Sequence, residues 1–393
     1  MTSEEIKWLL KRGVAETIIE TELVKMLESG KTLRFKQGFD PSCPDIHLGH
    51  AVGLRKLRHF QERGHSVILI VGDWTAQIGD PSGCSTTRTM LSSEEVQANA
   101  QTYMEQFFKI IDKDKTEIRW QSEWFSDFHL DDIIRLTSKF TVAQFLARED
   151  FSRRYTAGRP IAITELLYPL LQGYDSVAIK SDVEFGGTDQ KFNCLVGREL
   201  QQMMGQAPQQ VFLVPILVGT DGTQKMSKSL GNYIGIDEKP NDMYGKVMSI
   251  PDHLIIDYFE LVTDVTDEEI AEFKKQLEKE SINPMLLKKR LAYEIVAQFH
   301  APQSAREAEE YFTSVFQKGE SPDAENIVIL NLTGTLIEQL TRTGLTVSRS
   351  EGKRLLGQGA IEIDGQKITE DVEMTNIGYN KIIKVGKHRF AST

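Results

Sequence analysis

The sequence has few cysteines and no long hydrophobic run. Its three cysteines, Cys43, Cys84 and Cys194, lie far apart and lack the paired spacing of metal ligands, so neither a disulfide framework nor a zinc site is indicated. The most apolar runs, 67–71 and 211–218, are far shorter than the roughly 20 residues that span a bilayer. The first residues also lack a cationic segment followed by an apolar one, which is the pattern of a secretory signal. We therefore expect a cytoplasmic protein with reduced thiols and no membrane segment.

Charge is distributed unevenly along the 393 residues. The net charge of −11 argues against a protein that binds nucleic acid over its whole surface. Residues 334–393, however, contain nine Lys and Arg against seven Asp and Glu, whereas the rest of the chain contains 37 against 50. The basic character is therefore local to this end. A chain of this length has room for two or three domains.

The order of apolar runs and helical patterns predicts an α/β fold. Residues 66–71 and 211–218 are continuous apolar runs, typical of strands buried on both faces, and helical patterns lie between them. Such alternation indicates a parallel sheet with crossover helices. We expect residues 1–35 to form helices that pack on this sheet domain, and residues 92–155 to form a helical insertion within it.

Helix-capping patterns replace strands after the predicted sheet domain. Thr266 and Ser304 each precede a glutamate by three residues, and Asn283 precedes a proline, so a helix is expected to start at each. The last part, 334–393, has the pattern of two short helices and a hairpin that turns at 364–365.

A histidine pair lies where a helix is expected to begin, in the stretch 38–50. Free backbone N–H groups and the helix dipole make such a start a site for anions, and Gly49 lets a phosphate or a ring approach the backbone. His47 and His50, three residues apart, share one face of the first turn and could donate hydrogen bonds to phosphate oxygens. The alternative is a pair of polar histidines with no ligand.

Acidic residues follow two of the predicted strands. Asp80 lies in a loop after the run 66–71, where open sheets bind small ligands, and could accept an ammonium group; alternatively, it only shapes its turn. Asp189 follows the paired glycines at 186–187, which admit a ligand, and could hold ribose hydroxyls.

A helix predicted at 161–172 carries polar residues on one face. Thr164, Tyr168, Gln172 and Asp175 recur about once per turn among leucines. We interpret them as the polar wall of a pocket, the alternative being a solvated helix face.

Lysines and serines gather in the loop 225–229, between Gly222 and Gly231. Lys225 and Lys228 would form a mobile cationic arm that suits a polyphosphate, although a charge-rich surface loop is the simpler interpretation. The histidine pair and this loop are independent features that suit the same triphosphate, and together they favour the functional interpretation.

The end of the chain is expected to form a compact basic surface. Arg349, Lys353 and Arg354 share a helix that also has an apolar face. The strands beyond that helix add Lys381, Lys384, Lys387 and Arg389. Such a surface is typical of proteins that read the shape of the RNA backbone.

The histidine pair, the Lys-Met-Ser-Lys-Ser loop and the basic tail together resemble a class I aminoacyl-tRNA synthetase. Motifs between them narrow the resemblance to the bacterial tyrosyl-tRNA synthetases, and these motifs lie at 38–41, 78–83, 164–175 and 186–190. The resemblance covers nearly the whole chain. It includes a C-terminal module similar to that of a small-subunit ribosomal protein, which separates this family from its tryptophan-specific relative.

The resemblance implies three domains. The first is a Rossmann-type catalytic domain at 1–236 with its helical insertion at about 92–155. An all-helical domain at 237–320 and a small α+β RNA-binding domain at 334–393 follow.

The resemblance also implies roles for individual residues. Those implied in catalysis, through contacts with the ATP phosphates and the pyrophosphate leaving group, are His47, His50, Lys225 and Lys228. Those implied in binding the rest of ATP are Gly49, Gly187, Asp189, Met226, Ser227 and Ser229. Those implied in binding tyrosine are Gly38, Asp40, Asp80, Tyr168, Gln172, Asp175 and Gln190. Those implied in binding tRNA are Arg349, Lys353 and Arg354.

One position departs from the family pattern. Many members have a tyrosine that binds the substrate phenol two residues before the glycine of Gly-Phe-Asp, and this chain has Lys36 there. The phenol is therefore expected to rely on Asp175 with a different second partner.

The implied reaction activates L-tyrosine with ATP and Mg²⁺, giving tyrosyl-adenylate and pyrophosphate, and then transfers tyrosine to tRNA(Tyr). A homodimer without a tightly bound protein metal or a membrane contact is expected. One alternative is a nucleotidyltransferase that shares the histidine motif, but the helical domain and basic tail have no evident use there. Another is an RNA-docking protein that has lost catalysis, against which the intact histidines and lysines speak.

Overall fold

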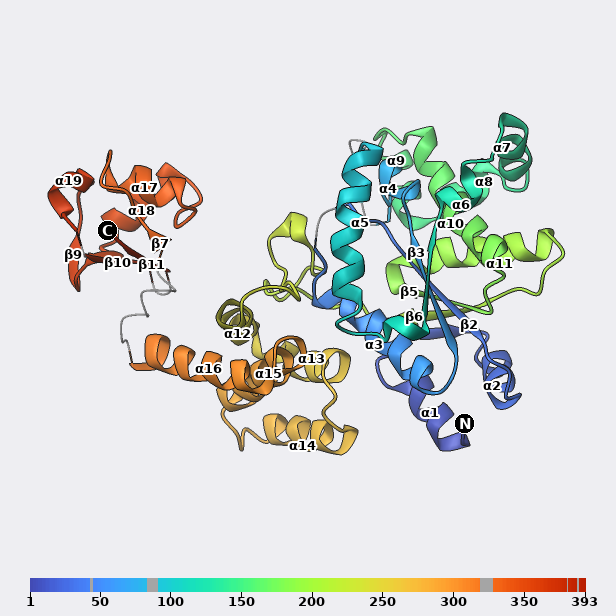
Figure 1. Ribbon diagram of the computed structural model, residues 1–393, viewed down its shortest axis with the longest axis horizontal. Helices are drawn as coiled ribbons and strands as arrows, with labels where there is room; N and C mark the ends of the chain where they lie inside the picture. Colours follow the sequence, from blue (N-terminus) through green and yellow to red (C-terminus); the bar gives the residue numbers. More distant parts are fainter. Residues whose placement is uncertain (43–44, 83–90, 319–327, 380, 387–388) are drawn as a thin grey trace. The chain divides into compact units, whose positions relative to one another are not determined.

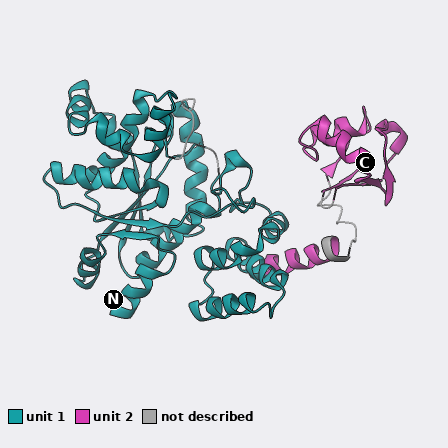
Figure 2. Cartoon of the chain, turned by 180° about the vertical axis from the view of Figure 1, so that it is seen from behind, with its two compact units in different colours: residues 1–302 teal, residues 303–393 magenta. Residues whose placement is uncertain are grey.

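The computed structural model describes residues 1–393 except 43–44, 83–90, 319–327, 380 and 387–388 (Figure 1). Three residues named above lie outside this part, Cys43, Cys84 and Lys387, as do some positions of the stretches 38–50, 78–83 and 237–320. By its contacts the chain divides into two compact units, 1–302 and 303–393 (Figure 2). The boundary falls inside the predicted domain 237–320, and the division into three domains stays a prediction.

A six-stranded sheet forms the centre of the first unit, in the order β1-β6-β5-β2-β3-β4. Its strands are β1 Glu16–Ile18, β2 Arg34–Phe39, β3 Ser66–Val71, β4 Thr116–Trp120, β5 Val183–Gly187 and β6 Gln210–Val214. The strands from β6 to β4 pair in parallel, whereas β1 pairs antiparallel at the edge. The predicted parallel sheet is confirmed, and the central strands are buried along nearly their whole length, as their apolar runs indicate.

Helices connect these parallel strands. They are α3 Leu48–Glu62, α5 Ser93–Phe107, α10 Ile163–Ile179 and α11 Lys191–Met203. The helices α10 and α11 approach closely at two glycines, because a Cβ added to Gly173 would lie 3.1 Å from the backbone nitrogen of Gly197. The backbone of α10 therefore lies almost against that of α11.

Two predictions about the sheet domain are wrong in part. The first 35 residues contain β1 between α1 Ser3–Lys11 and α2 Glu20–Glu28. The predicted helical insertion at about 92–155 contains β4, which pairs with β3 as the far edge of the sheet. The remaining part of that stretch is helical, in α6 Ser122–Phe125, α7 Leu130–Thr137, α8 Val142–Leu146 and α9 Glu149–Thr156.

Helices also form the end of the first unit. They are α12 Pro240–Ser249, α13 Ile255–Val262, α14 Asp267–Glu278 and α15 Pro284–Phe299. Thr266 caps α14 by accepting from the Glu269 N–H, and Asn283 caps α15 by accepting from the Met285 N–H, as predicted. In the part of the chain that the structure describes, no helix is long and apolar enough to cross a membrane.

The second unit contains helices and a small sheet. Its helices include α16 Pro302–Phe312, α17 Leu336–Arg342, α18 Arg349–Gly357 and α19 Met374–Ile377. Its sheet has the order β7-β11-β10-β8-β9, with β7 Val328–Ile329, β8 Ile361–Ile363, β9 Gln366–Ile368, β10 Ile382–Val385 and β11 Arg389–Ser392. The predicted hairpin is confirmed, because β8 and β9 pair antiparallel across Asp364 and Gly365, whose φ angles are 48° and 81°. The start predicted at Ser304 is wrong, since α16 begins at Pro302.

Candidate active site

A cavity of about 830 Å³ lies at the carboxyl ends of β2, β3, β5 and β6. This is where open parallel sheets bind their ligands. Every residue that the sequence implies in catalysis, ATP binding or tyrosine binding lines this one cavity. The fold therefore brings these residues together, and their roles stay predictions.

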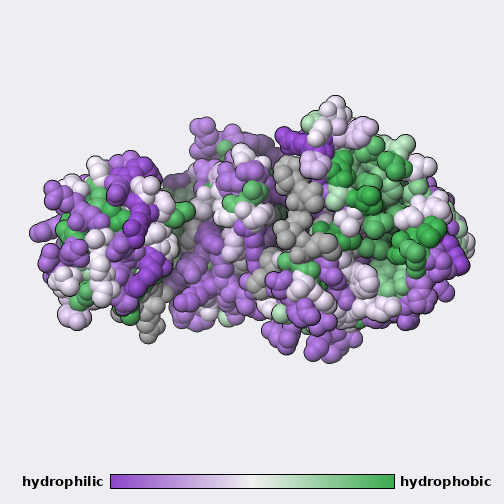
Figure 3. Space-filling view, turned by 90° about the horizontal axis from the view of Figure 1, so that it is seen from above, coloured by the Kyte–Doolittle hydropathy of each residue, from purple (hydrophilic) through white to green (hydrophobic). Residues whose placement is uncertain are grey.

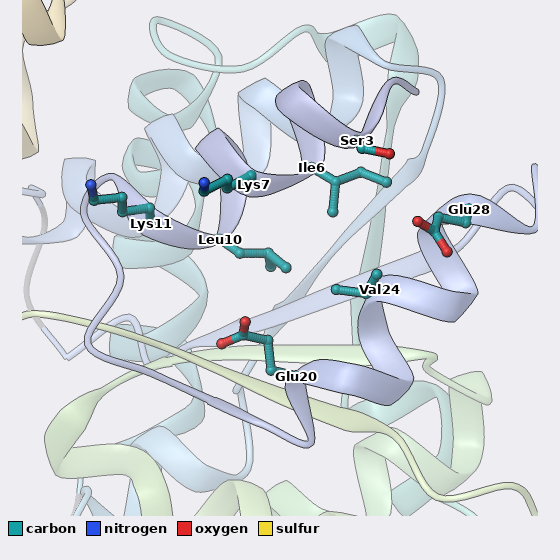
Figure 4. A pocket seen from close by; sticks show the side chains of 8 residues that line it. All are labelled: Ser3, Ile6, Lys7, Leu10, Lys11, Glu20, Val24 and Glu28. Atoms are coloured by element: carbon teal, nitrogen blue, oxygen red, sulfur yellow. The ribbon is translucent and has the colours of Figure 1, made fainter.

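A second hollow of about 450 Å³ lies between α1 and α2 (Figure 4). It has apolar side chains between the helices and charged groups around them. Its lining is Ser3, Ile6, Lys7, Leu10, Lys11, Glu20, Val24 and Glu28. Because this hollow contains none of the residues implied by the motifs, the larger cavity is the candidate site.

The two histidines form the start of α3. His47 is the N-cap residue; its Nδ1 accepts from the Gly49 N–H at 3.2 Å, and His50 Nδ1 accepts from the His47 N–H at 3.2 Å. A Cβ at Gly49 would lie 2.9 Å from the His47 ring, so glycine is needed between the histidines. The local backbone therefore fixes both rings, and their centroids lie 4.1 Å apart.

Burial keeps the two imidazoles neutral. It lowers the pKa of His47 to about 2, with His50 and the nearby lysines adding to the effect. Burial also lowers the pKa of His50 to about 4, assisted by Lys228. Since each Nδ1 accepts a backbone hydrogen bond, the proton of each neutral ring is assigned to Nε2. Each histidine thus keeps one N–H donor, at Nε2.

The lysine loop follows β6 and lines the same cavity as these histidines. Lys225 Nζ lies 3.2 Å from Asp189 Oδ2, and Lys228 Nζ lies 3.2 Å from Asp45 Oδ2. The hydroxyls of Ser227 and Ser229 lie 2.8 Å apart. Both lysines are therefore paired with carboxylates that a polyphosphate would have to displace.

Asn232 holds the shape of this loop, and no pattern in the sequence indicated this role. Its Oδ1 accepts from the Ser227 N–H at 2.8 Å, and its Nδ2 donates to Asp221 Oδ2 at 2.7 Å and to the Lys225 carbonyl at 3.1 Å. The side chain is buried, so these bonds are shielded from water.

Side chains of the following helical segment hold the stretch that leads into the loop. Tyr258 on α13 donates its hydroxyl to the Val218 carbonyl at 2.6 Å. His253, in the short helix Asp252–Leu254, lies with Nε2 3.2 Å from the Gly222 carbonyl. The conformation of the loop thus depends on residues outside the sheet.

Carboxylates gather at the other end of the cavity. Asp80 accepts from Gln190 Nε2 at 2.7 Å, and Asp40 Oδ2 accepts from the Tyr168 hydroxyl at 2.8 Å. Burial and the charges of these two carboxylates raise the pKa of Tyr168 well above its usual value. The phenol of Tyr168 therefore stays protonated, in surroundings that suit a cation.

Asp175 lies deeper in the cavity, on α10. It accepts from Gln121 Nε2 at 2.9 Å and from Trp124 Nε1 at 3.2 Å. Burial raises its pKa to about 7, against the opposing effects of Lys36 and the Gln121 hydrogen bond. Sequence reasoning missed Gln121 and Trp124, because the strand that they follow, β4, was itself missed.

Lys36 and Gln37 are further residues that the sequence did not assign. Lys36 is completely buried, and its Nζ binds protein groups rather than facing the cavity. Gln37 lines the cavity, and its Oε1 is buried without a hydrogen-bond partner among the described residues.

The predicted tRNA contacts lie on one exposed helix. Arg349, Lys353 and Arg354 are exposed on α18, whose Leu355 and Leu356 are buried in the second unit. Arg349 also pairs with Glu338 at 2.7 Å. The helix therefore presents a basic face to solvent, as the sequence predicted.

Arg389 fits the predicted basic surface less well. Its guanidinium donates to the Leu345 carbonyl at 2.5 Å and pairs with Glu351 at 3.2 Å. This side chain therefore has a structural role within the second unit.

Comparisons with known proteins agree with these features. Residues 28–317 match the family described as tRNA synthetases class I (W and Y). A tyrosine–tRNA ligase of Dehalococcoides mccartyi strain CBDB1 is 62% identical over 392 residues, which are 99% of this chain and 98% of the relative. One of Thermotoga maritima is 51% identical over 391 residues, which are 99% and 97% of the two chains.

Solved structures show the same fold. A C-terminally truncated mitochondrial tyrosyl-tRNA synthetase of Aspergillus nidulans aligns with a TM-score of 0.66 at 20% identity, covering 79% of this chain and 94% of the other. A tyrosyl-tRNA synthetase of Archaeoglobus fulgidus, solved with L-tyrosine, aligns with a TM-score of 0.63 at 23% identity, covering 78% and 99%.

Proposed function

Because this chain belongs to the class I tRNA synthetases of the tryptophan and tyrosine type and is a tyrosine–tRNA ligase, we propose that its cavity binds ATP at one end and tyrosine at the other. The observation that carries this proposal is the contrast between the two ends. Two lysines and two neutral imidazoles line one end, and the carboxylates of Asp40, Asp80 and Asp175 line the other.

The first step joins tyrosine to AMP. A carboxylate oxygen of tyrosine attacks the α-phosphorus of ATP and forms a bond to it. The bond between the α-phosphorus and the oxygen that bridges to the β-phosphorus breaks, so that pyrophosphate leaves. The carboxylate is already a nucleophile, and therefore no protein base is required. Catalysis consists of positioning the reactants and stabilising negative charge on the phosphates.

The histidine pair and the lysine loop supply that stabilisation. The Nε2–H groups of His47 and His50 donate to phosphate oxygens without adding a full charge. Lys225 and Lys228 exchange their carboxylate partners for the β- and γ-phosphates as negative charge builds on the leaving group. The remaining residues proposed to contact ATP are Gly49, Gly187, Asp189, Met226, Ser227 and Ser229.

We assign Mg²⁺ to the substrate, as an ion that accompanies ATP. Among the described residues, there is no group of three or more His, Cys, Asp or Glu side chains arranged to hold a metal. The ion would neutralise phosphate charge, while the lysines act on the leaving group.

The carboxylate end selects tyrosine. The Tyr168 hydroxyl donates to Asp40 and keeps its oxygen free to accept, so with Asp80 and Gln190 it can receive the tyrosine ammonium group. The substrate phenol donates to Asp175. Phenylalanine would leave this buried carboxylate without that donor, which is costly. Gly38 and Gln172 complete the proposed tyrosine site.

The second step transfers tyrosine to tRNA(Tyr). A hydroxyl at the 3′ end of the tRNA attacks the adenylate carbonyl carbon, the bond from that carbon to the phosphate oxygen breaks, and AMP leaves with its phosphate taking up the hydroxyl proton. The exposed basic face of α18, with Arg349, Lys353 and Arg354, is proposed to contact the tRNA backbone.

We also propose a cytoplasmic homodimer. Large apolar side chains are exposed on and beside α7, α8 and α9, and they are Leu130, Ile134, Val142, Tyr155 and Ile163. Figure 3 shows hydrophobic residues gathered on the face of the first unit where these helices lie. Such a patch supports a protein interface. Replacing Leu130 and Ile134 with glutamate should give a monomer by light scattering, and an unchanged mass would contradict this interface.

Exchange of pyrophosphate into ATP tests the first step directly. We expect exchange to depend on tyrosine in a screen of the twenty amino acids. A preference for tryptophan, or no exchange with any amino acid, would refute the proposed site.

A further inference from the structure

A buried ion pair lies beneath the proposed tyrosine site. Lys36 on β2 and Glu184 on β5 are paired in register, and their charged groups lie 3.0 Å apart with side chains 0% and 1% exposed. The Lys36 ammonium also donates to the Gln172 carbonyl at 2.9 Å and to the Ser176 hydroxyl at 2.8 Å. An ammonium group has three N–H donors, and here three acceptors occupy them. Lys36 therefore has no donor left for a substrate.

Glu184 also binds α10, through side chains of that helix. Its Oε1 accepts from Gln172 Nε2 at 3.2 Å, and its Oε2 accepts from the Ser176 hydroxyl at 3.1 Å and from Gln209 Nε2. Gln172 and Ser176 lie one helical turn apart, with Asp175 between them. The ion pair thus holds the one turn of α10 that carries two proposed tyrosine-binding residues.

Stability alone does not explain two buried charges at this place. Desolvation costs a buried pair most of its Coulombic gain, and a well-packed apolar pair often stabilises a fold equally well or better. A buried pair with directional hydrogen bonds differs from an apolar one in fixing the positions of the groups it binds. The two members act oppositely on Asp175: Lys36 lowers the pKa of this carboxyl, and Glu184 raises it.

We propose that the Lys36–Glu184 pair is a positioning device that fixes Gln172 and Asp175 toward the substrate phenol and so sets the selectivity for tyrosine over phenylalanine. This proposal rests on the proposed tyrosine site. In this chain a buried pair behind the pocket takes the place of a side chain that touches the phenol.

The test is the kinetics of pyrophosphate exchange by the full chain with Lys36→Met and Glu184→Gln combined, so that no unpaired charge is left buried. We expect KM for tyrosine to rise about tenfold and the ratio of kcat/KM for tyrosine over phenylalanine to fall about tenfold, equivalent to one lost hydrogen bond. The KM for ATP should stay within about twofold, because the pair contacts no residue of the ATP end.

Two single variants separate positioning from folding. Ser176→Ala removes the hydroxyl that accepts from Lys36 and donates to Glu184, without changing the charge of either residue. It should raise KM for tyrosine about threefold even if the double variant fails to fold. Lys56→Met is the matched control, because Lys56 is also a buried lysine and donates to the Arg12 carbonyl at 2.8 Å, away from α10. It should lower the melting temperature and leave the tyrosine-to-phenylalanine ratio unchanged.

Three results would overturn the proposal. The first is a folded double variant with an unchanged tyrosine-to-phenylalanine ratio. The second is equal increases in KM for tyrosine and for ATP. The third is a Ser176→Ala enzyme with unchanged KM for tyrosine, which would leave the pair a purely structural role. Failure of the tyrosine site itself has a different signature, because the unmodified enzyme would then show no tyrosine-dependent exchange.

Discussion

The neutral histidines at the start of α3 make stability depend on pH in a defined direction. His50 has a pKa of about 4 in the folded chain, against 6.5 when it is unfolded. Below pH 6.5 the unfolded chain therefore gains a proton that the folded chain does not bind, and the free energy of unfolding falls as the pH falls. Above pH 6.5 neither state is protonated, and the contribution of His50 is fully present.

The size of this effect follows from the two pKa values. Each pH unit between them changes the free energy of unfolding by about 1.4 kcal/mol. At pH 5, about 1.5 units below the unfolded pKa, the free energy of unfolding should be about 2 kcal/mol lower than at neutral pH because of His50. Asp175 acts in the opposite direction. Its pKa is raised to about 7 in the folded chain, so as the pH falls the folded chain binds this proton at a higher pH than the unfolded chain does. Only a comparison of variants therefore isolates the histidine.

His50→Asn provides that comparison. The amide oxygen of the introduced asparagine can still accept the His47 N–H, but the side chain does not titrate. All four tryptophans lie in the first unit, so their fluorescence during urea unfolding reports this unit. Between pH 7 and pH 5 the variant should lose about 2 kcal/mol less than the unmodified protein. His129→Asn, at an exposed histidine, is the matched control and should behave like the unmodified protein.

Equal losses in His50→Asn and the unmodified protein would falsify the assignment of a neutral, Nε2-protonated ring. Nitrogen NMR gives an independent check. At pH 6 the Nδ1 of His50 should be unprotonated and its Nε2 protonated. A doubly protonated ring would contradict the donor geometry proposed for the phosphates.

Three further predictions concern catalysis. Lys228→Ala should lower kcat for exchange about 100-fold while KM for tyrosine changes little, since the lysine acts on the leaving group; equal losses in both would contradict this role. Tyr258→Phe removes the donor to the Val218 carbonyl at the base of the lysine loop, and should lower kcat for exchange about tenfold without changing KM for tyrosine. Tyr244→Phe, in the same helical segment but bonded elsewhere, is its control, and a similar loss there would refute the anchoring role. Deleting residues 334–393 should spare exchange but abolish tRNA charging, and charging that survives would show that the tail is not the tRNA contact.

The parts of the fold with strong local signals could be predicted from the sequence. β3 has the predicted limits, because its continuous apolar run is buried on both faces. The caps at Thr266 and Asn283 lie where their side-chain oxygens indicate. At Ser304 the same reasoning failed, because Pro302 fits the first turn of a helix and α16 starts there.

The candidate site could be predicted where its residues follow recognisable strands. β4 has only five residues, Thr116–Trp120, at the edge of the sheet and within a mainly helical stretch. Missing this strand hid Gln121 and Trp124, which orient Asp175. The partnership of Lys36 with Glu184 could not be predicted either, because it depends on the register of two strands far apart in the sequence.

The carboxylate partners of the two loop lysines have a consequence for turnover. Under the proposed function, Lys225 and Lys228 each give up a carboxylate when they take a phosphate, so nucleotide binding exchanges one anion for another and the number of ion pairs changes little. Loss of pyrophosphate runs the same exchange backwards, since Asp189 and Asp45 compete for the lysines as the product departs. In the proposed mechanism, this competition from the two carboxylates favours the release of pyrophosphate.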